Sequence, residues 1–251
     1  MSARFYDIAL RWGAREESTH SCAVRLARML DSLAAIHPAF RKWNRQGYNE
    51  EQWNKPFCVM PPDVDELTDI FERSRQYTDT SRELMPDLGF SASAWNGSEG
   101  PLGVNASWRA GAYGDFPDFP NAVEMNVDGP TVDNADLINP DTLKSLFLAM
   151  IEAWEPSWAS IVDGDYWKPF YEKKPFPPFR SGWMTYFSAP YAKKITAPLS
   201  AIVESTKGGG ILILATNEPF TTSDPKHVAV ADAIQACLEP FQSDPRLLRE
   251  K

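Results

Sequence analysis

Residues 180–188 have the sequence RSGWMTYFS, and this stretch decides how the chain folds because its composition predicts a buried strand. A proline-rich segment precedes it and Pro190 ends it, while its aromatic and Thr residues favour a strand between these limits. Alternation would place Trp183, Thr185 and Phe187 on one side of a sheet and Met184, Tyr186 and Ser188 on the other. None of these side chains is chemically reactive. The stretch therefore indicates a core strand and not an active site.

The composition of the whole chain predicts a folded, acidic protein. Its 251 residues suit one large domain or two small ones packed together. A hydrophobic content of 43%, with 12% aromatic residues, is enough to bury a core. The formal net charge of −9 disfavours binding to nucleic acid or to an anionic membrane.

The cysteines and the N-terminal residues predict a cytoplasmic location. Cys22, Cys58 and Cys237 are far apart and odd in number, so each is expected to be a buried thiol in a reducing compartment. The first twelve residues contain charges that a signal peptide would exclude, and no run approaches the ~20 apolar residues of a membrane helix.

Helical periodicity and capping residues predict about four helices. The first spans about Ser18 to Ile36, and a second follows Asp63, whose side chain can cap a helix with Glu66 three residues on. A third begins at Asn139-Pro140, and a last one opens at Asp224-Pro225. Residues 40–60 are irregular and rich in aromatic and amide side chains, which is typical both of a functional loop and of a loop held to the core by its tryptophans.

Alternating patterns predict that the strands pair mainly antiparallel. Residues 4–12 form a first strand, and residues 90–95, 102–108 and 122–127 form a three-strand meander. Residues 201–205 and 210–215 form a hairpin whose apolar run should be doubly buried. Runs of strands set between helices favour an α+β fold. We expect a single domain over residues 1–251. Two packed halves, 1–136 and 137–251, are the alternative.

The sequence contains no recognisable catalytic or metal-binding motif, so we predict no catalytic residues, no metal and no cofactor. The three histidines lie in separate elements, and neither a G-x-S-x-G elbow nor a phosphate loop occurs. Asp163 and Asp165 form the best remaining candidate for chemistry, since two neighbouring carboxylates can bind a cation or act as acid and base. A turn explains Asp-Gly-Asp equally well.

Acidic residues are concentrated in residues 61–140, which hold fifteen Asp and Glu against four Lys and Arg. Several fall in connections around the meander, beside aromatic residues, and such a combination can steer and then anchor a basic protein partner. A solvated acidic surface that keeps the protein soluble is the alternative. The candidate partner-binding residues are Trp53, Tyr113, Asp115, Phe116, Asp118, Asp128, Asp133, Asp136, Asp163 and Asp165.

Several features of the sequence form a familiar combination: the opening strand and helix, the loop with Tyr48, Trp53 and Asn54, the meander with Trp95 and Trp108, and the strand with Gly182-Trp183-Met184-Thr185-Tyr186. On these features the chain resembles the immunity protein 52 family. The resemblance implies an α+β bacterial antitoxin that binds a cognate toxin, usually one with a restriction-endonuclease-like nuclease domain and often delivered by type VI secretion.

The resemblance implies a non-enzymatic inhibitor that contacts no nucleic acid or membrane itself. A nuclease surface is basic because it binds phosphates, and an acidic inhibitor can occupy it with fast association. Two other functions stay open: a hydrolase that uses Asp163 and Asp165, and a chaperone or adaptor that accompanies a secreted effector without neutralising it.

Overall fold

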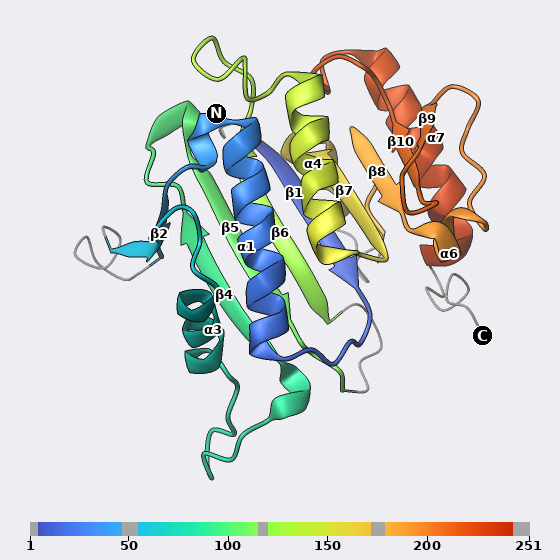
Figure 1. Ribbon diagram of the computed structural model, residues 1–251. Coiled ribbons are helices and arrows are strands. Elements are labelled where there is room, and N and C mark those ends of the chain that lie inside the picture. Colours follow the sequence, from blue (N-terminus) through green and yellow to red (C-terminus); the bar gives the residue numbers. More distant parts are fainter. Residues whose placement is uncertain (1–4, 47–54, 115–119, 172–178, 243–251) are drawn as a thin grey trace.

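The strands form one ten-stranded antiparallel sheet in the order β3-β2-β4-β5-β6-β1-β7-β8-β10-β9 (Figure 1). The structure is a computed structural model that describes residues 5–46, 55–114, 120–171 and 179–242. The α+β class predicted from the sequence is confirmed. The strands are β1 (Phe5–Trp12), β2 (Trp43–Arg45), β3 (Pro56–Cys58), β4 (Phe90–Trp95), β5 (Val104–Ala110), β6 (Asn121–Asp128), β7 (Trp158–Asp163), β8 (Met184–Phe187), β9 (Ile202–Ser205) and β10 (Ile211–Leu214).

Within the described ranges, six α-helices accompany the sheet, whereas the pattern of the sequence predicts about four. They are α1 (Thr19–Ile36), α3 (Val64–Arg73), α4 (Pro140–Trp154), α5 (Gly164–Tyr171), α6 (Ala189–Ala192) and α7 (Pro225–Gln242). Single 3-10 turns lie at Pro38–Phe40, Pro86–Leu88 and Gly100–Leu102. The predicted caps are present: Asp63 accepts hydrogen bonds from the amides of Asp65 and Glu66, and Asn139 caps α4 in the same way.

The N-terminal strand β1 lies in the middle of the sheet and joins its two parts. It pairs with β6 on one side, where Ile8 is opposite Met125, and with β7 on the other, where Ile8 is opposite Ile161. The segments 1–136 and 137–251 therefore contribute to one continuous sheet. An apolar strand in this position is buried on both faces, as the zero exposure of Ile8, Ala9 and Leu10 shows.

Helices α1, α3 and α4 cover one face of the sheet (Figure 1). Trp12 at the end of β1 stacks on Trp154 of α4 with a centroid separation of 5.5 Å. The opposite face is covered over β7 and β8, where Phe179 packs on Trp158 and α7 is tied in through Gln235 and Ser181. Over β4, β5 and β6 this second face is polar, and exposed Ser91, Asn105 and Arg109 alternate along the strands with residues of the core.

The stretch at 180–188 is a core strand, as predicted, although β8 itself covers only residues 184–187. Thr185 and Phe187 face the same side as Ser160 and Trp158, and Met184 and Tyr186 face the other side. Gly182 lies directly against β7: a Cβ atom there would be 2.7 Å from the carbonyl oxygen of Ile161. The glycine permits this close approach of the two backbones.

Two segments without a regular pattern contain structure that the sequence analysis does not predict. Within residues 40–60, β2 and β3 extend the sheet beyond β4. The aromatic segment after α4 forms β7 and α5. The strand is not predicted because all six residues of β7 are buried, so that no alternation marks it. Such a fully buried strand cannot be told from a helical segment by periodicity.

Candidate interaction surfaces

The acidic and aromatic residues that the sequence analysis grouped together lie at opposite ends of β6. Tyr113, which is 37% exposed, precedes this strand, and Asp128 ends it, with Asp133 and Asp136 in the following connection. Eight extended residues separate the two ends by roughly 24 Å. The sequence neighbours therefore do not form one patch. Trp53, Asp115, Phe116 and Asp118 lie outside the described residues.

The connection after β6 is held by the buried side chain of Asn134. Its Oδ1 accepts from the amide and the hydroxyl of Thr131, and its Nδ2 donates to the carbonyl oxygens of Pro101 and Gly129. Asp133 and Asp136 on either side are exposed. His37 Nε2 lies 3.3 Å from the Asp136 carboxylate, and this contact lowers the pKa of Asp136.

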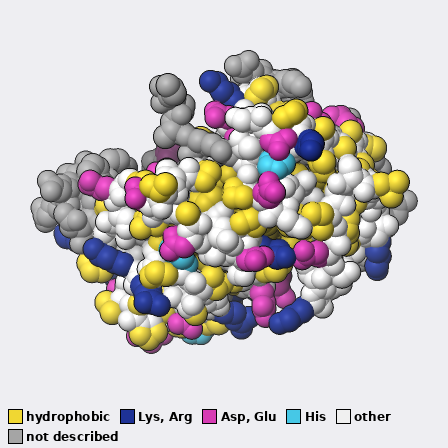
Figure 2. Space-filling view, turned by 90° about the horizontal axis from the view of Figure 1, so that it is seen from above, with side chains coloured by type: hydrophobic (Ala, Val, Ile, Leu, Met, Phe, Trp, Pro, Cys, Tyr) yellow, Lys and Arg dark blue, Asp and Glu magenta, His cyan; other side chains and the backbone are white. Residues whose placement is uncertain are grey.

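The end of the molecule that carries this connection does not present one continuous acidic field. Seen from above, acidic side chains are interspersed with hydrophobic and basic ones (Figure 2). A short-range arrangement of a few carboxylates, and not a uniform potential, is therefore what a partner would meet at this end.

Asp163 and Asp165 are not a pair of free carboxylates. Asp163 is fully buried, and its Oδ1 accepts from the amides of Asp165 and Tyr166, so it fixes the start of α5. Asp165 is exposed. This geometry is that of a helix start, which places Asp163 away from any surface that a partner or a substrate can touch. In the described ranges, no group of three or more His, Cys, Asp or Glu side chains is placed to hold a metal ion.

The buried cysteines have the properties expected of structural thiols. Cys22 and Cys58 are buried, and burial raises the pKa of each thiol to about 12. A thiol with such a pKa is a poor nucleophile at neutral pH.

Among the helices that the structure describes, none combines the length and the apolar character needed to cross a membrane.

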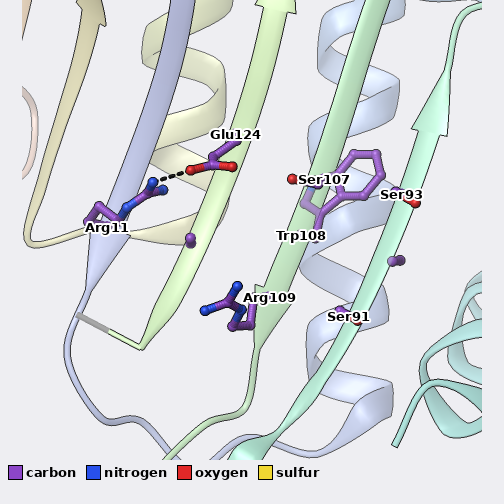
Figure 3. A pocket seen from close by; sticks show the side chains of 9 residues that line it. Arg11, Ser91, Ser93, Ser107, Trp108, Arg109 and Glu124 are labelled. Atoms are coloured by element: carbon purple, nitrogen blue, oxygen red, sulfur yellow. Dashed lines mark hydrogen bonds and ion pairs between the residues drawn. The ribbon is translucent and has the colours of Figure 1, made fainter. Parts of the chain in front are cut away.

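The polar face of the sheet holds a depression of about 450 Å³ whose side chains come from β1, β4, β5 and β6 (Figure 3). Arg11 and Glu124 form an ion pair at one side of it, and Arg109 lies across from them (Figure 3). Although burial acts against it, the positive charge of Arg11 holds the pKa of Glu124 below its usual value. Ser91, Ser93 and Ser107 contribute short polar side chains to its lining.

A second depression lies between α4 and the strands beyond it. This α4 groove has a volume of about 550 Å³, with walls from the C-terminal half of α4, from the β9–β10 hairpin and from the start of α6. The ion pair between Lys144 of α4 and Glu204 of β9, with an N–O distance of 3.1 Å, connects the two walls. The floor of the α4 groove is apolar, with Ile151, Tyr186 and Leu212 each less than a tenth exposed.

Comparison with known proteins decides the family. The sequence profile of immunity protein 52 matches residues 4–242, which is nearly the whole chain. This chain belongs to the immunity protein 52 family. Among solved structures, a Pseudomonas aeruginosa protein described as T6SS protein PA0821 has a similar fold, with a TM-score of 0.52 and 13% sequence identity. The match covers 93% of this chain and 73% of the other. No curated protein sequence matches the chain.

Family membership makes the surfaces, and not a reaction centre, the features to explain, since an immunity protein acts on a cognate toxin. The polar sheet face was accessible to sequence reasoning, because the alternation that predicts the meander also separates its Ser and Arg residues from its core residues. The α4 groove was not, because its walls come from segments about 60 residues apart, as the Lys144–Glu204 pair illustrates.

Proposed function

We propose that this protein neutralises a cognate nuclease toxin of the restriction-endonuclease-like type, delivered by a type VI secretion system, by forming a stoichiometric complex with it. The family match over residues 4–242 carries this proposal. The similar Pseudomonas aeruginosa structure is that of a protein described as a T6SS protein, which is consistent with the delivery route.

The charge of the chain supports a nuclease as the partner. A net charge of −9 repels nucleic acid and attracts a protein whose surface is basic because it binds phosphates. The exposed carboxylates after β6, Asp133 and Asp136, and that of Asp165 are available to steer such a partner during encounter. On this proposal the protein works in the cytoplasm, where a DNA-directed toxin would act.

Co-expression with the toxic domain encoded by the neighbouring gene tests the proposal. Cells that carry the toxin under an inducible promoter should survive only when this protein is also present, and the two proteins should co-purify. Loss of chromosomal DNA in unprotected cells is expected for a nuclease. Death without DNA damage would refute the nuclease part alone, and absence of both rescue and complex would refute immunity.

A titration of purified toxin with purified protein separates inhibition by binding from enzymatic inactivation. Residual nuclease activity should fall linearly and reach zero near one molar equivalent of the immunity protein. A hydrolase that modifies the toxin would instead inactivate a large excess of it over time. A chaperone would bind and leave the nuclease activity intact.

A further inference from the structure

We infer that the α4 groove is the anchoring site for the toxin and that it takes a Lys or Arg side chain from an exposed, partly apolar segment of that partner. The inference rests on the proposed function, since it assumes a basic partner. The inference adds to the proposed function the surface that binds the toxin and the chemistry that this surface recognises.

One face of α4 supplies the first wall. Lys144, Leu148 and Ile151 recur at helical spacing and lie on the side of the helix that faces the β9–β10 hairpin. Leu148 packs against the core and remains partly exposed. It therefore adds accessible apolar surface to the wall of the groove.

An exposed carboxylate at the groove is available to a cationic occupant. Glu152, Glu155, Glu204 and Lys207 line the groove. Glu204 is paired with Lys144 and Glu155 with Arg25. Glu152 forms no ion pair within the described ranges and is exposed. Its charge is available to a partner.

The floor of the groove suits the stem of a long cationic side chain. Lys and Arg lay their methylene groups along apolar surface and keep the charged head near polar groups. Here the apolar floor formed by Ile151 and Leu212 lies below a carboxylate rim. The hydroxyl of Thr206 is enclosed at the same site, next to the phenol of Tyr186.

The volume agrees with an anchor and not with a flat contact. About 550 Å³ is within the range of pockets that enclose a ligand or a bulky side chain. Desolvated pockets that receive Arg or aromatic side chains are the places where binding energy is concentrated in protein interfaces. The depression on the polar sheet face is smaller, at about 450 Å³, and its exposed Arg109 would repel a basic partner (Figure 3).

Charge variants of the full-length protein test the inference through the dissociation constant of the complex with the toxin domain. Glu152→Arg should weaken binding by about tenfold or more at low salt, since it replaces attraction by repulsion. Lys207→Glu, in an exposed turn, should tighten binding. Glu239→Arg, an exposed acidic residue on α7 that lies outside the groove lining, is the matched control and should bind within about twofold of the wild type.

A steric variant adds an independent readout. Ser188→Trp places an indole at the edge of the groove and should abolish the complex while far-ultraviolet circular dichroism and the melting temperature stay close to those of the wild type. Wild-type affinity in both Glu152→Arg and Ser188→Trp would overturn the groove as the anchor and leave the proposed function standing. A wild-type protein that binds no toxin would overturn both.

Discussion

The side chain of Asn134 should be worth about 3 kcal/mol of stability, and its replacement by Ala measures how firmly the acidic connection after β6 is held. Asn134 is fully buried and makes four hydrogen bonds, two as acceptor and two as donor, with lengths from 2.7 to 3.0 Å. In Asn134→Ala, the buried carbonyl oxygen of Gly129 loses its donor. Leaving such a group unsatisfied costs about 1–3 kcal/mol.

The other three bonds are only partly buried, so water replaces part of each. With a net value of about 0.5 kcal/mol for each of them, the total is about 3 kcal/mol. For a chain of this length, 1 kcal/mol lowers the melting temperature by roughly 2–4 °C. Asn134→Ala should therefore melt roughly 6–12 °C below the wild type.

Chemical denaturation measures the same loss as a lower midpoint with an unchanged slope. The matched control is Asn105→Ala, since Asn105 is an exposed asparagine that accepts one bond of 3.3 Å from Gln46, and it should change stability by less than about 0.5 kcal/mol. A midpoint for Asn134→Ala that equals that of Asn105→Ala would refute the assignment of Asn134 as the residue that holds this connection.

Two further predictions concern the decisive stretch and the pH dependence of stability. Gly182→Ala should lower stability by about 1–3 kcal/mol, because its Cβ would overlap a backbone oxygen of β7, whereas Gly208→Ala meets nothing within 4 Å and should not; equal melting temperatures would contradict this. Hydrogen bonds from Arg75 and Thr19 lower the pKa of Glu72 from 4.5 to about 2, so its contribution is present above pH 4.5 and is lost as the pH falls toward 2. The stability difference between wild type and Glu72→Gln should shrink over this interval, and a constant difference would contradict the assignment.

The sequence predicts the fold well wherever local signals act alone. Asp63 and Asn139 mark helix starts through their own hydrogen bonds to the next turn, and the meander follows from strict alternation in residues 90–127. β7 is missed because it is buried on both faces and shows no period. β2 is missed because three residues are too few to show a pattern.

The placement of surface residues depends on topology, which local patterns do not contain. Tyr113 and Asp128 are close in sequence, yet β6 carries them to opposite ends of the sheet. Lys144 and Glu204 are far apart in sequence, yet they meet across the α4 groove because β9 pairs with β10 at the edge of the sheet beside α4. The sequence makes Asp163 a candidate for chemistry. Its burial and its hydrogen bond from the amide of Asp165 show instead that it fixes a helix start.

The same topology places the proposed steering and anchoring groups along one helix. The connection with Asp133 and Asp136 leads directly into the capped start of α4, and the groove is lined by the C-terminal half of that helix (Figure 1). At 1.5 Å per residue, the start of α4 and Glu152 are roughly 20 Å apart. An interface of ordinary size buries about 800 Å² on each partner, which is roughly 30 Å across. One toxin domain is therefore large enough to be steered by the carboxylates at the start of α4 while its cationic side chain enters the groove.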